Sequence, residues 1–299
     1  MRDFLRYITP NFLLNTYRNS KKAKVRKAIT HQQKSGQSHT QESLVDQLKS
    51  AGLVSGDAVL VHASLSKIGH VENGPITIIQ ALKEVVGETG HLLMPTSPNA
   101  GYQLDYIRSL TVFDVLESPS KLGAISEVFR KMPGVIRSEN ATEPVSCCGP
   151  NAAWFVEGHL YEITPYTEKS PFARLAAAGG KIIYIGVTLA NAGTSLHVLE
   201  DAITAFSESV YYPEIFHVII RKSDGTEEQV ATKVHDPAQS AKRRCDELLP
   251  LFKEKCVYHE VKIGQATTLV FDAKKMLEVM IAAYHENGVT MYAPLGKNA

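Results

Sequence analysis

A histidine and a glutamate three positions apart, His197 and Glu200, are the pair in this sequence best suited to acid–base chemistry. Three positions along a helix place two side chains on one face, where the carboxylate can orient the imidazole and favour its charged form. Imidazole titrates near neutral pH, which suits a general base. The alternative is a half-exposed histidine beside a solvated glutamate on an ordinary surface helix.

The segments around this pair alternate between strand-like and helix-like patterns. Three apolar runs predict buried strands: residues 58–61, 91–94 and 181–187. Helices are expected where a capping residue or a proline precedes an amphipathic stretch: after Thr40, from Pro75 to Gly87, and after Ser120. The last apolar run comes just before His197, which places the pair after the carboxyl end of a strand. We therefore expect an α/β fold with a central, largely parallel sheet flanked by helices.

The C-terminal third has a different pattern. Two β-type stretches, 217–221 and 228–234, flank Asp224-Gly225, and this predicts an antiparallel hairpin. Other segments are helix-like at 238–252 and 272–286, with a strand-like stretch near 257–263. The fold should therefore carry an added hairpin and further helices after the main sheet.

Composition places the chain among ordinary globular proteins. Of its 299 residues, 44% are hydrophobic and 21% are charged, enough for one large domain or two small ones. No apolar run approaches the ~20 residues of a membrane-spanning helix, and the first residues lack the apolar stretch of a secretory signal. Four cysteines form neither a disulfide pattern nor a zinc-binding spacing. These features predict a cytoplasmic protein.

The net charge of +1 hides a basic N-terminal segment. Residues 1–30 hold eight basic residues and one acidic residue, which leaves 24 basic and 30 acidic residues, or about −6, for the remainder. Thr9-Pro10 predicts a helix start. Such a helix could lie on an anionic membrane surface, at roughly 1 kcal/mol per basic group, or pack on the domain with its charges in water. Nucleic-acid binding is not expected, because nothing else in the chain is basic.

The polar stretch 31–39 is interpreted as a linker. The predicted organisation is therefore a basic arm and linker over residues 1–39, followed by a single catalytic domain over residues 40–299. The oligomeric state is left open.

Four segments follow one another along about 140 residues in an order typical of a known family. They contain His62-Ala63-Ser64-Leu65, then Pro119-Ser120-Lys121-Leu122-Gly123, then Ser170-Pro171-Phe172, and finally Thr194-Ser195-Leu196-His197 with Glu200. In this order the chain resembles the aminoglycoside 3-N-acetyltransferase family from about residue 40 to about residue 285. The resemblance implies an α/β fold unlike the common acetyltransferase fold, and transfer of an acetyl group from acetyl-CoA to an amine of an amino sugar.

The resemblance also implies roles for particular residues. His197 corresponds to the family's catalytic histidine and Glu200 to the acid beside it. Residues 62–65 and 119–123 match segments that hold the phosphates and the pantetheine arm. The expected cofactor-binding residues are His62, Ser64, Leu65, Lys67, Ser120, Lys121 and Gly123. Backbone N–H groups at such turns can bind phosphates without basic side chains, and each lysine could equally be an ordinary surface residue.

The expected chemistry needs no covalent intermediate and no metal. An ammonium group is not nucleophilic until it loses a proton, and His197 would take that proton as the amine attacks the thioester. Thr194, or a nearby backbone N–H, would stabilise the oxyanion. His197 and Glu200 have the spacing of two zinc ligands, but no third ligand is evident. A nucleophilic Cys147 or Cys148 is a minor alternative.

One departure from the family pattern concerns the acceptor. The family usually has His-Pro where this chain has Asn140-Ala141, in a segment near the acceptor. Asp114, Asn140 and Glu143 are therefore the expected acceptor-binding residues. The basic arm favours a nucleotide-linked amino sugar as the acceptor, for a surface polysaccharide; the alternative is an aminoglycoside. The acyl group could be acetyl or longer.

Two further readings belong to other classes. Ser64 or Ser195 could act with a histidine in a hydrolase, although no Gly-x-Ser-x-Gly turn is present. A non-catalytic membrane-docking protein would explain the basic arm but not the Ser/Gly loops.

Overall fold

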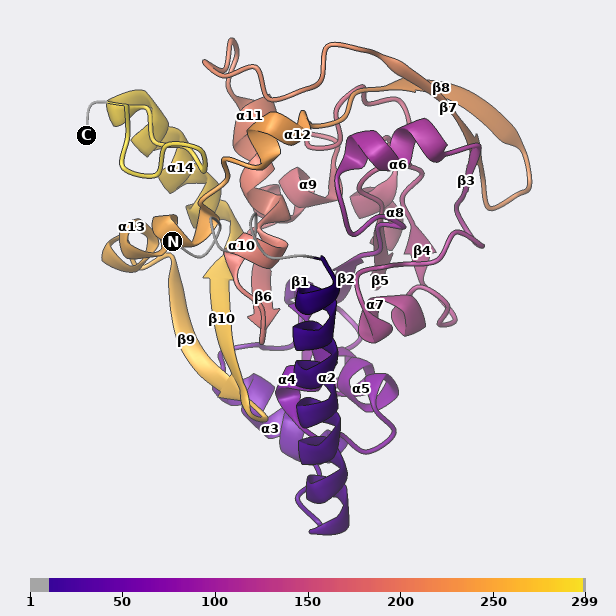
Figure 1. The fold of residues 1–299 in the computed structure, drawn as a ribbon, viewed down its shortest axis with the longest axis vertical. Helices are drawn as coiled ribbons and strands as arrows, with labels where there is room; N and C mark the ends of the chain where they lie inside the picture. The colour runs from indigo at the N-terminus through magenta and orange to yellow at the C-terminus, as the bar shows by residue number, and fades with distance from the viewer. Residues whose placement is uncertain (1–10, 298–299) are drawn as a thin grey trace.

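A seven-stranded mixed sheet forms the centre of the molecule (Figure 1). The computed structural model describes residues 11–297, so the expected helix start at Thr9-Pro10 lies outside the described residues. The strand order is β4-β5-β2-β1-β6-β10-β9. The strands are β1 (Ala58–Ala63), β2 (His91–Pro95), β4 (Ile136–Arg137), β5 (Val145–Cys148), β6 (Lys181–Ile185), β9 (Tyr258–Ile263) and β10 (Ala266–Asp272). The three central strands, β2, β1 and β6, are parallel, and antiparallel pairs extend the sheet on both sides.

Helices cover both faces of this sheet, which explains why its central strands are continuous apolar runs. Leu60 points into one core cluster, whereas Val59 and Val61 point into the other, as the period of two in a strand requires. One face carries α3 (Gln41–Ser50), α5 (Pro75–Val86) and α7 (Ala124–Phe129). The other carries α8 (Ala152–Val156), α9 (Pro171–Ala177), α13 (Leu249–Glu254) and α14 (Ala273–Asn287). The predicted α/β class is confirmed.

The expected hairpin is present but belongs to a second sheet. Strands β7 (Phe216–Arg221) and β8 (Glu227–Thr232) pair antiparallel around Gly225, whose φ of 84° suits glycine at such a turn. β3 (Val112–Asp114) lies parallel to β7 and completes a three-stranded sheet beside the central one. The chain after β8 leads back toward the carboxyl end of β6.

Two sequence-based expectations for helices need correction. The segment 238–252 is not one helix but three short ones: α12 (Pro237–Ser240), η2 (Cys245–Leu248) and α13. Pro250 lies in the first turn of α13, where its missing N–H costs least, so a new helix begins there. Ser120 does not cap a helix, because α7 begins at Ala124 after Gly123.

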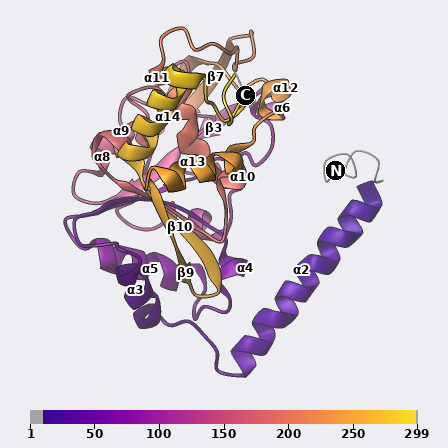
Figure 2. The same cartoon turned by 90° about the vertical axis from the view of Figure 1, so that its left-hand side faces the viewer.

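The stretch 31–39 is only partly a linker, because α2 (Asn11–Lys34) continues through its first four residues. α2 stands beside the domain and diverges from it toward its N-terminal end (Figure 2). Its C-terminal end is attached where the Gln32 side chain accepts a hydrogen bond from the backbone N–H of His70, at 2.9 Å. Among the described residues, no helix is long and apolar enough to cross a membrane.

The remaining helices are short and lie at the edges of the sheet. They are α4 (Leu65–Ile68), α6 (Gln103–Ser109), α10 (Leu189–Ala192), η1 (Thr194–His197) and α11 (Val198–Ala202). Three of them, α10, η1 and α11, follow β6 without a long connection, so the chain turns repeatedly at the carboxyl end of a central parallel strand. That is where a ligand site is expected in an α/β sheet.

Candidate active site

His197 and Glu200 meet at the junction of η1 and α11. His197 Nδ1 lies 2.8 Å from Glu200 Oε1, so the expectation that the two side chains share a face is confirmed. Both side chains are buried, with exposed fractions of 3% and 5% for the two residues. The pair is therefore not the solvated surface histidine and glutamate of the alternative reading.

Two residues from distant parts of the chain complete the surroundings of Glu200. His235, just after β8, lies with Nε2 2.7 Å from Glu200 Oε2. Tyr292, beyond α14, donates its hydroxyl to Glu200 Oε1 at 2.7 Å. Both carboxylate oxygens thus accept hydrogen bonds, as a buried carboxylate requires. The two imidazole rings are 4.2 Å apart, and the ring of Tyr166 stacks on that of His197 at 4.9 Å.

Burial and charge together set the protonation of this cluster. Burial would raise the pKa of Glu200, but His197 and His235 outweigh it and hold that pKa well below its usual value. Burial lowers the pKa of His197 to about 4, against the opposing effect of Glu200, so the ring is neutral at pH 7. An ionised carboxylate can only accept, so Nδ1 of the neutral ring carries the proton and Nε2 has a free lone pair.

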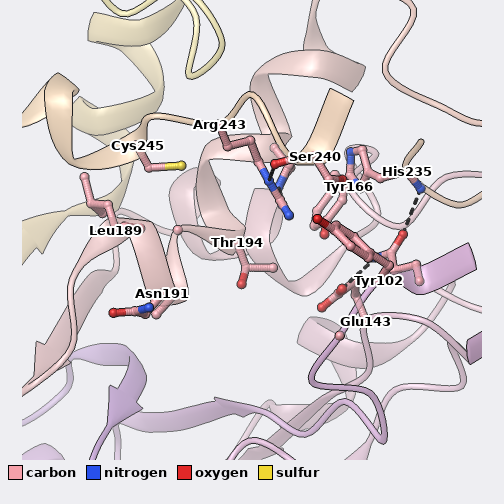
Figure 3. Close-up of a pocket in the computed structure, with 16 residues that line it drawn as sticks. Tyr102, Glu143, Tyr166, Leu189, Asn191, Thr194, His235, Ser240, Arg243 and Cys245 are labelled. Atoms are coloured by element: carbon pink, nitrogen blue, oxygen red, sulfur yellow. Dashed lines mark hydrogen bonds between the residues drawn. The ribbon is translucent and has the colours of Figure 1, made fainter. Parts of the chain in front are cut away.

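Nε2 of His197 faces a cavity of about 150 Å³, here called the His197 cavity. Arg243, in the turn between α12 and η2, points into it and lies with NH1 2.9 Å from Nε2 (Figure 3). On the opposite side Gln103 donates to Glu143 at 2.6 Å, and burial raises the pKa of this carboxyl. Thr194 and Asn191 form part of the wall.

A second cavity, the His62 cavity, adjoins the first. It has a volume of about 120 Å³ and shares Asn191, Ala192 and Thr194 with the His197 cavity. Its other lining residues come from the ends of β1 and β2, from α7 and the loop before it, and from Val187 after β6. The α10–η1 segment therefore contributes to the walls of both cavities.

His62 has an unpaired nitrogen in this second cavity. It stacks on Tyr184 with 5.0 Å between ring centroids, and Nε2 is buried without a hydrogen-bond partner. Burial lowers the pKa of His62 to about 3, so the ring is neutral. An unpaired buried polar atom costs about 1–3 kcal/mol, and a ligand with a polar group in the cavity would remove that cost. The residues present thus fit an elongated ligand with polar groups along its length.

The other expected cofactor-binding residues fall into two groups. Ser64, Leu65 and Lys67 lie in the turn after β1 and in α4, next to His62. Lys121 and Gly123 are exposed on either side of Leu122, which lines the His62 cavity. Ser120 is buried and its hydroxyl bonds Ser126, so it stabilises the loop instead of facing the cavity.

Of the three expected acceptor-binding residues, only Glu143 lines the His197 cavity. The Asn140 side chain is buried and accepts hydrogen bonds from Thr142 and from the Glu143 backbone, so it shapes the loop that carries Glu143. Asp114 accepts from its own loop backbone and pairs with Arg221, outside both cavities. The expected contacts of Asp114 and Asn140 with an acceptor are therefore not supported.

Sequence reasoning missed the residues that the tertiary fold brings to the site. His235 follows β8 by three positions, and no spacing links it to Glu200. Arg243 lies in the run Lys242-Arg243-Arg244, which resembles a surface charge cluster. The only local signal was Asp236-Pro237, which marks the start of α12 and hence a turn of the chain near His235.

His235 also supplies the third metal-binding side chain that the sequence did not reveal. One ligand atom from each of His197, Glu200 and His235 lies within 4.8 Å of the others. However, each carboxylate oxygen already has an imidazole N–H donor, and the Arg243 guanidinium lies next to His197. A fixed positive charge there disfavours a cation, so the arrangement suits a hydrogen-bonded relay better than a metal site.

The geometry also weighs against the alternative nucleophiles. Cys147 and Cys148 lie in β5 within the sheet, and burial raises the pKa of both thiols. Ser195 is buried and its hydroxyl has no hydrogen-bond partner, so it is not paired with His197. Ser64 contacts the hydroxyl of Ser66 at 3.5 Å. Neither Ser64 nor Ser195 is therefore activated by a histidine.

Comparisons with known proteins show the family of this chain. The family model described as aminoglycoside 3-N-acetyltransferase matches residues 60–285. Aminoglycoside N(3)-acetyltransferase VII of Streptomyces paromomycinus is 31% identical over 174 residues, which is 54% of this chain and 60% of that protein. The match thus spans less than two thirds of that curated relative.

Solved structures extend the likeness over more of the chain. The structure described as AAC-IIIb binary with CoASH superimposes with a TM-score of 0.71 at 26% identity, covering 83% of this chain and 97% of that one. The structure described as AAC-VIa bound to sisomicin gives a TM-score of 0.70 at 27% identity, covering 83% and 97%.

Proposed function

Because this chain belongs to the aminoglycoside 3-N-acetyltransferase family, we propose that it transfers an acyl group from acetyl-CoA to the amine of an amino sugar. One observation carries the proposal. The unprotonated Nε2 of the neutral His197, which accepts a hydrogen bond from Arg243, faces a cavity that shares wall residues of the α10–η1 segment with a second one. An amine in the His197 cavity and a thioester in the His62 cavity would meet beside Thr194.

His197 is the general base in this proposal. As the amine nitrogen attacks the thioester carbonyl carbon, Nε2 takes a proton from that nitrogen. The imidazolium that forms is stabilised by the Glu200 carboxylate. Glu200 is held in place by three hydrogen bonds, one each from His197, His235 and Tyr292. The C–S bond then breaks, and the proton on His197 can pass to the departing sulfur. Acetyl-CoA supplies the activated acyl group, and no covalent intermediate on the protein is needed.

Two groups beside His197 have supporting roles. In the absence of an acceptor, the Arg243 guanidinium donates a hydrogen bond to His197 Nε2. This hydrogen bond must break when the amine binds there. The guanidinium then remains next to the reacting atoms. Thr194 borders both cavities, so its hydroxyl is suited to donate to the oxyanion of the tetrahedral intermediate.

The acceptor we propose is an aminoglycoside-type amino sugar. Related proteins are named for aminoglycosides, and one solved relative is described with sisomicin bound. Glu143 and Gln103 offer a carboxyl and an amide in the His197 cavity, and an ammonium group beside Glu143 would favour the charged form of that buried acid. The nucleotide-linked amino sugar that the basic arm favoured has no counterpart among these relatives.

The test is thiol release from acetyl-CoA with sisomicin, with a nucleotide-linked amino sugar, or with no amine. We expect turnover with sisomicin alone, and no change after treatment with a chelator. Release without an amine would indicate a hydrolase, and no release with any amine would indicate a non-catalytic protein. Turnover with the nucleotide sugar alone would contradict the proposed acceptor, and loss of activity with the chelator would contradict the metal-free mechanism.

Contact of the basic arm with an anionic membrane remains a separate prediction. The described basic side chains of α2 are exposed, as such contact requires. Co-sedimentation with phosphatidylserine vesicles, compared with neutral vesicles, tests it directly. If the protein stays in solution with both kinds of vesicle, the arm does not bind an anionic membrane.

A further inference from the structure

An open groove lies between α2, which precedes the region that the family model matches, and α4, which belongs to that region. It encloses about 740 Å³, more than either cavity at the His197 site. Its lining residues are Asn19, Lys21, Ala23, Val25, Arg26, Ile29, Ser66 and Lys67. Three of these are cationic and none is acidic. We call it the α2 groove.

The three cations of the α2 groove lack partners of opposite charge. Lys21, Arg26 and Lys67 are exposed, and among the described residues none of them forms an ion pair. Between the cations, Ala23, Val25 and Ile29 form an apolar wall. Cations around an apolar surface suit a ligand that joins phosphates to a flat, weakly polar ring.

The α2 groove adjoins the His62 cavity through one short turn. His62, at the end of β1, lines the cavity, and Lys67, in α4, lines the groove five positions later. The stem of Lys67 packs over the end of β6, where a Cβ on Gly186 would approach Lys67 Cβ to 2.4 Å. The segment 62–67 therefore carries residues that line the cavity, His62 and Ala63, and residues that line the groove, Ser66 and Lys67.

The position of α2 is set by contacts at its C-terminal end. Gln32 accepts the N–H of His70, and Ser38 contacts the ring of His70 at 2.7 Å. These residues attach the end of α2 and the segment after it to His70, in the loop that follows α4, so α2 is fixed close to the helix that carries Lys67. The groove is a product of this attachment and not of the family domain alone.

We propose that the α2 groove binds the adenosine 3′-phosphate 5′-diphosphate end of acyl-CoA, so that the basic arm completes the cofactor site. The inference rests on the proposed function, because it requires the pantetheine arm to occupy the His62 cavity. The phosphates of CoA carry about four negative charges, and three unpaired cations would meet them. The apolar wall would receive the adenine ring.

The test measures CoA binding by titration calorimetry with a matched pair of variants. In the first, Lys21→Ala and Arg26→Ala remove two cations that line the groove. In the control, Lys24→Ala and Lys27→Ala remove two exposed cations of α2 that do not line it. We expect the groove variant to bind CoA about ten- to a hundredfold more weakly, and the control within about twofold of wild type. Pantetheine, which lacks the phosphates, should bind all three proteins alike.

Each other outcome decides between the two proposals. Equal CoA affinity in wild type and the groove variant would overturn the role of the α2 groove while leaving the proposed function intact. An equal loss of CoA affinity in both variants would mean that the positive charge of the whole arm attracts CoA, and that the groove is not a specific site. Failure of wild type to bind CoA would overturn the proposed function and this inference together. Melting curves of the variants check that α2 remains folded on the domain.

Discussion

The His197 site and the α2 groove both present charged side chains to a ligand, but they use charge in opposite ways. At the site the Glu200 carboxylate is buried and bonded to two imidazoles, so Glu200 and His197 have strongly shifted pKa values and a fixed geometry. In the groove three cations are exposed and unpaired. A buried, paired charge can carry out chemistry because its protonation state is specified. Exposed charges act by their number and are weakened by salt.

The largest effect should follow from removing the base. His197→Ala should lower kcat by about a hundredfold or more, the usual range for a general base, while CoA binding persists. Steady-state kinetics and CoA titration measure the two quantities. The control is His217→Ala, which removes an exposed histidine of β7. Near-normal turnover in His197→Ala would remove this residue from the mechanism.

A smaller effect should follow from removing the unpaired nitrogen of His62. His62→Leu keeps most of the volume but loses Nε2, so the KM for acetyl-CoA should rise about three- to tenfold, the value of one hydrogen bond. Tyr184→Phe is the control, because it removes a buried hydroxyl without a partner that does not line the cavity. If both variants have the wild-type KM, then His62 does not contact the cofactor.

The effect of the Arg243 charge on the pKa of His197 should be visible in the pH profile of kcat. Burial is the main cause of the low pKa of His197, and Arg243 lowers it further. In Arg243→Gln that pKa should rise, so the base is protonated at higher pH and the acid limb of kcat moves upward in pH. The control is Arg244→Gln, which alters an exposed arginine next to Glu247. An unchanged or downward shift would show that Arg243 does not act on His197 electrostatically.

The smallest effect should be that of salt on the groove. Raising the salt from about 0.05 to 0.5 M shortens the screening length severalfold, so the KM for acetyl-CoA should rise a few-fold. The KM for acetyl-pantetheine should stay nearly constant, because the phosphates are absent. Identical salt dependence of the two thioesters would place the cofactor's phosphates away from the exposed cations.

Local patterns in the sequence were enough for the elements and for half of the site. Continuous apolar runs predicted β1, β2 and β6, capping residues and prolines predicted α3 and α5, and the hairpin came from Asp224-Gly225. The contact of His197 with Glu200 followed from helical spacing alone. Errors arose where a local pattern had two outcomes: the helix-like stretch 238–252 was divided at Pro250, and the polar stretch 31–39 began as helix.

The sequence by itself determined the α/β class, the family and the pair His197–Glu200, because each depends on short-range order along the chain. Only the tertiary structure decided that His235, Arg243 and Tyr292 surround that pair. Each is 35 to 92 positions along the chain from the residue that it contacts, and no sequence periodicity predicts a contact over that separation. The tertiary structure also showed that Asn140 supports the loop that carries Glu143. A side chain's protonation depends on burial and on neighbours from other segments, and the fold alone brings those together.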